Sequence, residues 1–307
     1  MSVNDVEKIR TTLSNKYIKG KGLEIGALQI PLPVKREVCV IYVDRIDIHT
    51  AKNVHYPELK DVNLVNVDVL DDGEFLNNIP HQSQDFIIAN HFLEHAQNPI
   101  LAIKNHLIRI RSGGIIYYAI PDKWKTFDKN RPLTTFGHIL RDYEQGPEIS
   151  YHSHIEEWVE LVNETPIEER EERIKKLKLI NYAIHFHVWD KNTFRDFIEK
   201  SNSLLENPFD ILEYVSVANE NIVIIRKKKS IEENSTLKTV PKSISKNLSL
   251  PIETLMEVYL ERDDLQHAYP EARDGKDLSR LLVWARNHGV KEENRLLRYS
   301  YYYETVG

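Results

Sequence analysis

Short apolar runs recur along the first two thirds of the chain, each bounded by polar residues, glycine or proline. They read "KGLEIG", "EVCVIYVD", "VNLVNVD", "QDFIIANH" and "GGIIYYAIP". Between several of them lie helical patterns, such as residues 98–111, whose apolar side chains recur at intervals of three and four. An amphipathic helix precedes the first run. This alternation of strands and helices predicts a parallel sheet that is covered on both faces.

The last two apolar runs, "DILEYVSVA" and "NIVIIRKKK", are separated only by the polar "NEN" near residues 219–221. Such spacing predicts a β-hairpin, so the seventh strand should lie antiparallel beside the sixth. The sequence therefore predicts an α/β fold: a Rossmann-like, seven-stranded mixed sheet with helices on both faces and an antiparallel last strand.

Three regions follow from the pattern. Residues 1–228 form the sheet domain, and its insertion at about 123–190 overhangs the carboxyl ends of the strands, where open α/β sheets bind ligands. Asp190 is the expected N-cap of the next helix. Residues 229–249 are rich in Lys, Ser and Asn and read as a linker. Residues 250–307 are predicted to form a small helical module that either docks a partner or packs on its own domain.

Composition narrows the class of protein. The chain has 307 residues, 41% of them hydrophobic, which is enough for a large core. The formal charge of -6 gives no basic field for nucleic acid. The single cysteine, Cys39, lies in an apolar run and is predicted to be a buried thiol. No apolar leader or membrane-spanning stretch is visible, so a cytoplasmic location is expected.

The first run ends in a single-glycine turn. Gly26 is followed by Ala27, without the repeated glycines that bring a backbone against a pyrophosphate. This turn favours a cofactor that has no phosphates, and it disfavours a dinucleotide oxidoreductase.

Acidic residues recur at the expected ends of the first three strands. Asp44, twenty residues after Glu24, can accept both ribose hydroxyls. Asp68, with Val69 beside it, can take an adenine amine, and Glu24 adds negative charge near an amino or sulfonium group. Each acid taken alone could instead be a solvated strand end. A ribose and an adenine without a diphosphate describe S-adenosylmethionine.

The residues quoted above resemble those of a known enzyme family. Residues 20–228 resemble a class I S-adenosylmethionine-dependent methyltransferase, and "DFIIANHFLEHAQNPILAIKNHLIRIRSGGIIYYAIPD" is similar to the family's segment from the fourth strand to the fifth. The resemblance implies that Asn90 and His91 line the methionine end of the cofactor and that residues 93–95 open the next helix. The first motif departs from the family pattern in having fewer glycines.

A narrower resemblance lies in "FDKNRPLTTFGHILRDYEQGP", "HSHIEEW" and "HFHVW". These segments are similar to methyltransferases found with, or fused to, bacterial glycosyltransferases of surface-polysaccharide synthesis. The C-terminal tail is similar to a helical segment of some of those glycosyltransferases. The resemblance implies a carbohydrate or nucleotide-sugar acceptor, and a glycosyltransferase partner that binds the C-terminal helices.

The insertion is rich in histidine. His138 and Asp142 are four residues apart and share a helix face, and His154 follows closely. One of these histidines could remove the proton of a sugar hydroxyl, with an acid to orient it. His185 and His187 alternate, which places them on one side of an extended strand. The same groups could instead hold a divalent metal, or could only cap and pack the insertion.

Three other insertion residues have two interpretations each. Arg131 could bind a sugar or an acidic group, or could pair internally. Trp158 and Trp189 could stack on a sugar, although core packing is the expected role of either alone.

The function expected from the sequence is S-adenosylmethionine-dependent O-methylation of a sugar hydroxyl in glycan or nucleotide-sugar metabolism. Two alternatives remain: O- or N-methylation of a small molecule outside glycan metabolism, and a noncatalytic methyltransferase-like scaffold for a glycosyltransferase.

Overall fold

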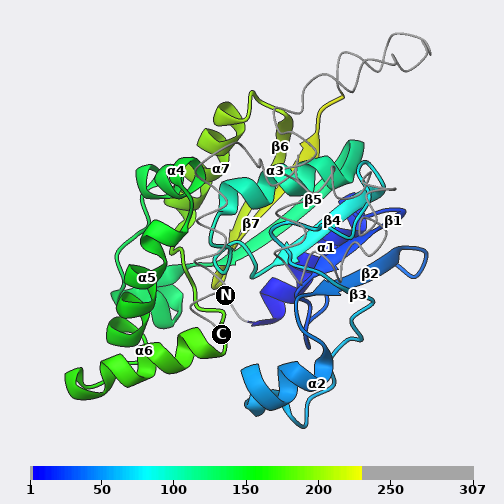
Figure 1. Ribbon diagram of the computed structural model, residues 1–307. Helices are drawn as coiled ribbons and strands as arrows, with labels where there is room; N and C mark the ends of the chain where they lie inside the picture. Colours follow the sequence, from blue (N-terminus) through cyan, green and yellow to red (C-terminus); the bar gives the residue numbers. More distant parts are fainter. Residues whose placement is uncertain (1–2, 230–307) are drawn as a thin grey trace, which may run out of the picture. The chain divides into compact units, whose positions relative to one another are not determined.

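A seven-stranded mixed sheet forms the centre of the computed structural model, which describes residues 3–229 (Figure 1). The strands are β1 (Lys21–Ile25), β2 (Cys39–Asp44), β3 (Val69–Leu70), β4 (Gln84–Asn90), β5 (Ile110–Pro121), β6 (Phe209–Val217) and β7 (Glu220–Lys227). Their order is β3-β2-β1-β4-β5-β7-β6. The strands β1 to β5 pair in parallel, whereas β7 is antiparallel to both β5 and β6. The predicted Rossmann-like mixed sheet is confirmed.

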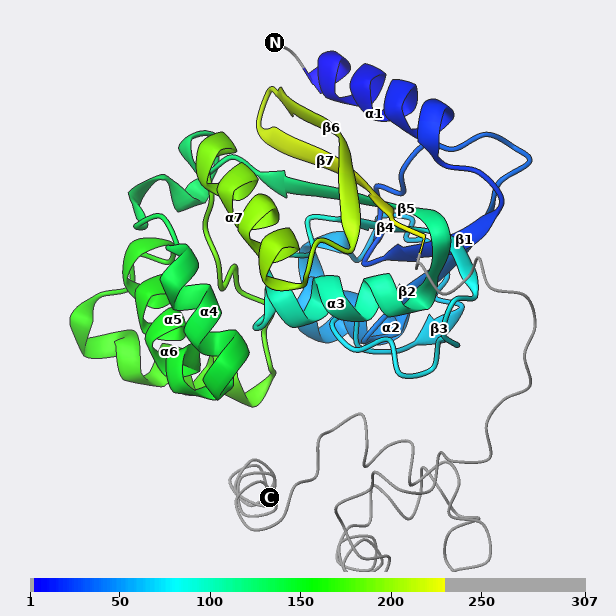
Figure 2. The ribbon, with the colours of Figure 1, turned by 90° about the horizontal axis from the view of Figure 1, so that it is seen from above.

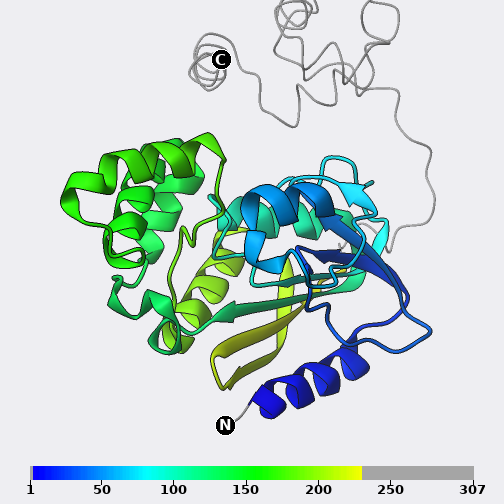
Figure 3. The same ribbon diagram turned by 90° about the horizontal axis from the view of Figure 1, so that it is seen from below.

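Helices cover both faces of this sheet, as predicted. They are α1 (Val3–Tyr17), α2 (Ile48–Thr50), α3 (Pro99–Arg109), α4 (Phe136–Gln145), α5 (Glu148–Leu161), α6 (Arg170–Leu179) and α7 (Lys191–Leu204). Helix α1 lies on one face and helices α3 and α7 lie on the other (Figure 2). Helices α4, α5 and α6 form a group at one end of the sheet (Figure 3), and α4 joins the main core through Ile139.

Alternation along the strands builds a core layer on each side. In β4, Phe86 and Ile88 belong to the cluster that α1 covers, whereas Ile87 and Ala89 belong to the cluster that α3 and α7 cover. Because successive side chains of a strand point to opposite faces, a continuous apolar run fills both layers. The run "DFIIA" is therefore a strand buried on both sides.

The connections differ from the predicted strand–helix alternation, which is wrong at two places. No helix joins β1 to β2, where residues 31 and 33 are proline. No helix joins β3 to β4 either. Proline lacks the backbone donor and restricts the residue before it, so closely spaced prolines prevent a helix from forming. Loops therefore take the place of helices beside the carboxyl ends of β1 and β3.

The insertion is fastened to the carboxyl edge of the sheet by backbone hydrogen bonds. The N–H of Lys123 donates to the Trp189 carbonyl at 3.0 Å, and the N–H of Phe186 donates to the Glu94 carbonyl at 2.7 Å. Asp190 then caps α7, as predicted, since its Oδ1 accepts from the N–H of Thr193 at 2.9 Å. The overhang on the ligand-binding edge is therefore part of the fold.

Three smaller expectations need correction or fall outside the described residues. Cys39 is exposed, not buried, because it begins β2, whose outer neighbour β3 is only two residues long. The hairpin turn lies at Ala218 and Asn219, slightly earlier than expected. The predicted linker at 229–249 and the helical module at 250–307 lie outside the described residues, apart from Lys229. Among the described helices, none has the length and apolar character needed to span a bilayer.

Candidate active site

The turn after β1 shows why a glycine stands at position 26. Gly26 has φ +64°, and its N–H donates to the Val43 carbonyl at 2.9 Å. This left-handed conformation costs most residues energy but is free for glycine. The turn brings Ala27 beside the end of β2.

A hollow, partly open to solvent, lies between this turn and the segments after β2. Ala27, Asp44, Ile48 and Val65 are among the residues that line it. Asp44 ends β2 as predicted, and its Oδ1 accepts from the N–H of Ile46 at 3.2 Å. Burial raises the pKa of the Asp44 carboxyl above its usual range. A half-buried carboxylate at this edge fits a ligand that brings hydroxyl donors, as a ribose does.

The expectation that Asp68 ends the third strand is wrong. Strand β3 begins after Asp68, whose Oδ2 accepts from the N–H of Tyr42 at 2.9 Å, within β2. Asp71 and Asp72 are the residues that follow β3 at the carboxyl edge, and Asp72 Oδ1 accepts from the N–H of Glu74 at 2.8 Å. The third strand was predicted to end at Asp68, two residues before the observed end at Leu70. The acidic pair directly after Leu70, in "LDD", was the sequence signal for that end. Val69, in β3, packs against the core.

Glu24 is buried at 1% exposure and shapes the turn. Its Oε1 accepts from the N–H of Leu32 at 2.7 Å, whereas Oε2 has no hydrogen-bond partner. Burial raises the pKa of Glu24 to about 7. Its predicted attraction to the amino and sulfonium groups of a cofactor stays a prediction.

Asn90, the last residue of β4, has a side-chain amide whose Nδ2 and Oδ1 are both buried without a hydrogen-bond partner. Leaving a buried donor and acceptor unsatisfied costs about 1–3 kcal/mol each. An amino-acid group, with its carboxylate and ammonium, offers both complements. Asn90 therefore fits the methionine end that the resemblance implies.

His91 follows with φ +50° and sits between two carboxylates. Its Nε2 lies 2.7 Å from Glu220 Oε1, and its Nδ1 lies 3.3 Å from Glu94 Oε1. Burial alone would lower the pKa of His91, but the hydrogen bonds to Glu220 and Glu94 raise it to about 9. The imidazole is therefore cationic at neutral pH, beside Asn90.

Beyond His91 lies a group that we call the Glu94 cluster: Glu94, His95 and His185. The carboxylate of Glu94 is buried, and its Oε1 lies 3.3 Å from His91 Nδ1. The Nδ1 atom of His95 lies 2.9 Å from the Ile184 carbonyl, and that of His185 lies 2.6 Å from Asp128 Oδ2. The acceptor at Nδ1 of His95 favours the tautomer that carries its proton there, which leaves His95 Nε2 with a free lone pair.

Electrostatics distinguishes the members of the Glu94 cluster. Burial, and then the neighbouring His185, lower the pKa of His95 to about 4, so its imidazole is neutral at pH 7. Burial would raise the pKa of Glu94, but the hydrogen bond from His91 holds it below its ordinary value. The cluster can therefore accept a proton, and its ligand atoms, which lie within 4.8 Å of one another, could also hold a metal ion. Sequence reasoning missed Glu94 and His95 because residues 93–95 were expected to open a helix, whereas α3 begins at Pro99.

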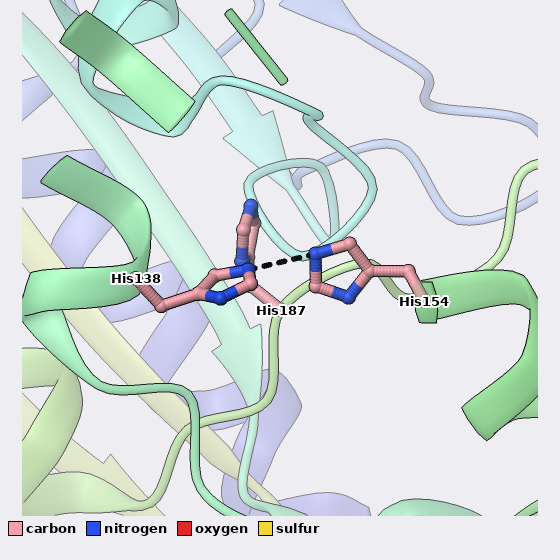
Figure 4. A group of neighbouring side chains, drawn as sticks. All are labelled: His138, His154 and His187. Carbon is pink, nitrogen blue, oxygen red and sulfur yellow. Dashed lines mark hydrogen bonds between the residues drawn. The ribbon is translucent and has the colours of Figure 1, made fainter. Parts of the chain in front are cut away.

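A second group, the three-histidine cluster, consists of His138, His154 and His187 (Figure 4). The Nε2 atoms of His138 and His154 lie 2.9 Å apart, and His138 Nε2 lies 3.2 Å from Asp142 Oδ2. Burial lowers the pKa of His154 to about 4 and that of His187 well below its ordinary value. The structure brings His138, Asp142 and His154 together, which the sequence by itself left open. Their catalytic role stays a prediction.

The expectation that His185 and His187 share one side of a strand is wrong. Residues 183–189 form no strand, and the two histidines belong to different clusters. The backbone here follows hydrogen bonds to the loop after β4: the N–H of His187 donates to the Glu94 carbonyl at 3.2 Å. Packing against that loop, and not pleating, sets the direction of each imidazole.

The remaining insertion residues have structural partners. Arg131 is fully buried, and its guanidinium lies 2.9 Å from Asp128 Oδ1 and 2.7 Å from Glu157 Oε1. Trp158 and Trp189 are buried at 7% and 2% exposure. Internal pairing and core packing are therefore the observed roles, and neither tryptophan offers an open face to a sugar.

Two aromatic side chains that sequence reasoning did not single out are exposed after β5. Trp124 is 60% exposed and Phe127 is 52% exposed. The Phe127 ring centroid lies 4.8 Å from that of His185. Their signal was the position of "DKWKTFDK" directly after the fifth strand. Phe127 therefore offers an exposed aromatic ring beside the Glu94 cluster, whereas the Trp124 ring packs against Lys123.

No known family profile and no curated protein matches the sequence. Solved structures are similar at low identity. A SAM-dependent methyltransferase from Aquifex aeolicus matches at 12% identity over 73% of this chain and 88% of its own, with a TM-score of 0.39. A protein named as a Zn-dependent alcohol dehydrogenase from Rhodobacter sphaeroides matches at 12% over 75% and 92%, with a TM-score of 0.45.

The carbon methyltransferase CurJ matches at 14% identity over 70% of this chain, with a TM-score of 0.37, and this chain spans only 50% of CurJ. These likenesses concern the fold alone. The strand order, with β7 antiparallel between β5 and β6, gives the chain a Rossmann-like methyltransferase fold.

Proposed function

We propose that this protein is an S-adenosylmethionine-dependent methyltransferase that O-methylates a sugar hydroxyl in glycan or nucleotide-sugar metabolism. The observation that carries the cofactor assignment is the buried, unpartnered amide of Asn90 at the end of β4. It lies at the same sheet edge as Asp44 and the Gly26 turn, because the carboxyl ends of parallel strands meet there.

Each end of the cofactor has residues that fit it. Asp44 would accept the ribose hydroxyls in the hollow beside Ala27, and Asn90 would bind the amino-acid end. The cationic His91 would attract the carboxylate of that end. When bound, S-adenosylmethionine supplies an electrophilic methyl group.

The acceptor hydroxyl needs a base, since its proton must leave as the oxygen becomes nucleophilic. We assign this role to His95, whose Nε2 lone pair is free and whose neighbour Glu94 would stabilise the imidazolium that forms. The Glu94 cluster contacts His91 directly, whereas the three-histidine cluster contacts the later residue Gln97. His95 is therefore better placed for the base than His138 or His154.

A sugar acceptor is supported by the exposed rings of Trp124 and Phe127. The apolar face of a pyranose packs on aromatic rings, while its hydroxyls seek polar partners. The Glu94 cluster supplies such partners next to Phe127. A cytoplasmic location and a glycosyltransferase partner complete the proposal on sequence grounds.

Calorimetric titration with S-adenosylmethionine, S-adenosylhomocysteine and NAD tests the cofactor. We expect binding of the two adenosyl compounds and none of NAD. A panel of nucleotide sugars and oligosaccharides, assayed by mass spectrometry for a gain of one methyl group, then tests the acceptor. Methylation of non-sugar acceptors alone would reject the sugar assignment, and no binding of either adenosyl compound would favour the scaffold alternative.

A further inference from the structure

The three-histidine cluster joins separate parts of the insertion. His138 projects from α4, His154 from α5, and His187 from the extended segment before α7, and their side chains point toward one another (Figure 4). One nitrogen from each imidazole lies within 4.8 Å of the other two. His154 and His187 are buried, whereas the His138 side chain is 23% exposed.

The hydrogen bonds within the cluster leave acceptors without donors. The Nε2 atoms of His138 and His154 face each other at 2.9 Å, so one proton can serve that pair. His187 Nδ1 is buried without a hydrogen-bond partner, and Asp142 Oδ2 has only His138 Nε2, 3.2 Å away, beside it. Buried polar atoms are nearly always satisfied in folded proteins, so this concentration of lone pairs needs a positive partner.

The protein itself offers no cation that fills this need among the contacts of the described residues. Arg141 reaches only the outer nitrogen of His138, at 3.3 Å from Nδ1. Arg131 is taken up by Asp128 and Glu157. A bound cation could accept one nitrogen lone pair from each of the three histidines.

We propose that His138, His154 and His187 bind a zinc ion that fastens α4 and α5 to the segment before α7. Three imidazoles are a ligand set that zinc takes in tetrahedral geometry, with water in the fourth position. Ligand bonds of about 2.0–2.1 Å place the ligand atoms of a tetrahedron about 3.3 Å apart. The separation of 2.9 Å between the Nε2 atoms of His138 and His154 is close to that value, and the three ligand nitrogens lie within 4.8 Å of one another.

Outer contacts surround the ligands. Asp142 Oδ2 lies 3.2 Å from His138 Nε2, and Asp142 Oδ1 accepts from the Ser150 hydroxyl at 2.8 Å. His187 Nε2 lies 3.4 Å from the Gln97 carbonyl, which leaves Nδ1 for the ion. Outer hydrogen bonds of this kind are typical of metal-ligating residues.

The test measures zinc in the full-length chain, purified without a histidine tag. We expect about one zinc per chain, removed by 1,10-phenanthroline and restored by added zinc. Cobalt added to the metal-free chain should give the visible absorption of a tetrahedral Co²⁺ site. His154→Gln and His187→Gln should each bind at least about tenfold less metal. His152→Gln, an exposed neighbour on α5, should bind as much as the unchanged chain.

Three results would overturn the proposal. Failure of the unchanged chain to bind zinc or cobalt would do so directly and does not depend on any variant folding. Equal metal content in His154→Gln and His152→Gln would do so as well. Loss of metal in Glu94→Gln with full content in His154→Gln would place the ion in the Glu94 cluster. Because S-adenosylmethionine binding is measured separately, failure here leaves the proposed function standing.

Discussion

The Nε2 atom of His91 lies 2.7 Å from Oε1 of Glu220, which stands 129 residues later in the chain. The same carboxylate oxygen lies 2.5 Å from Nη2 of Arg10 in α1. One buried carboxylate therefore joins the N-terminal helix, the end of β4 and the start of β7. Glu220 therefore links the stability of the domain to the carboxyl edge of the sheet.

Replacing Glu220 with glutamine should lower the free energy of unfolding by about 3–5 kcal/mol, because Arg10 would keep a buried charge without a counter-charge. The matched control is Asp210→Asn, which breaks the exposed pair with Arg226 and should cost less than about 1 kcal/mol. Urea unfolding of both variants measures the difference. An equal loss of unfolding free energy in both variants would show that the buried Glu220 pairs stabilise the fold no more than the exposed Asp210 pair does.

Glu24 should make stability depend on pH. Its folded pKa of about 7 lies above the ordinary value of 4.5, so the folded state holds the proton more tightly. The stabilisation is complete below pH 4.5 and is lost as the pH rises through about 7, a change of about 3 kcal/mol. Relative to Glu24→Gln, the unchanged protein should therefore lose stability over that window. If the unfolding free energies of the two proteins changed with pH in parallel, the raised pKa of Glu24 would be contradicted.

Asp44→Asn should weaken S-adenosylmethionine binding by about 1–3 kcal/mol, since a charged hydrogen bond to the ribose is lost. Asp68→Asn is the control, because its carboxylate is occupied by the Tyr42 N–H and lies before β3. Calorimetric titration of the two variants with S-adenosylmethionine shows which of the two carboxylates contributes more to cofactor affinity. A larger loss of affinity in Asp68→Asn than in Asp44→Asn would favour Asp68 as a cofactor-binding residue, as expected from the sequence.

His95→Gln should slow turnover by about 10²–10⁴-fold while leaving S-adenosylmethionine affinity unchanged, because a base acts on the acceptor and not on the cofactor. His152→Gln, exposed on α5, is the histidine control. Single-turnover kinetics with the acceptor found by screening gives the rate. Turnover equal to that of the control would remove His95 as the base.

Trp124→Ala and Phe127→Ala should each raise the KM for a sugar acceptor, by about 0.5–1.5 kcal/mol in binding free energy, through loss of a stacking face. Leu179→Ala is a suitable control, since Leu179 is an 81% exposed apolar side chain on α6. An unchanged KM in both aromatic variants would argue against a pyranose lying on this surface.

Local patterns were enough to predict several elements from the sequence. The β4 run, the helix capped by Asp190 and the turn at Gly26 each depend on neighbours along the chain, through side-chain alternation, an N-cap and a left-handed residue. The hairpin of β6 and β7 follows from the same kind of short-range signal. The fold class and the placing of Asp44 at the end of β2 followed from these, whereas the place of Asn90 was implied by the family resemblance.

Contacts between distant segments decided the rest. The register of β3 against β2 put Asp71 and Asp72, and not Asp68, at the carboxyl edge. The packing of residues 183–189 on the loop after β4 sent His185 to one cluster and His187 to the other. Sequence by itself determined which chemical groups the chain possesses and which short elements it forms. Only tertiary structure decided which groups meet, because pairing register and packing depend on residues that no local pattern contains.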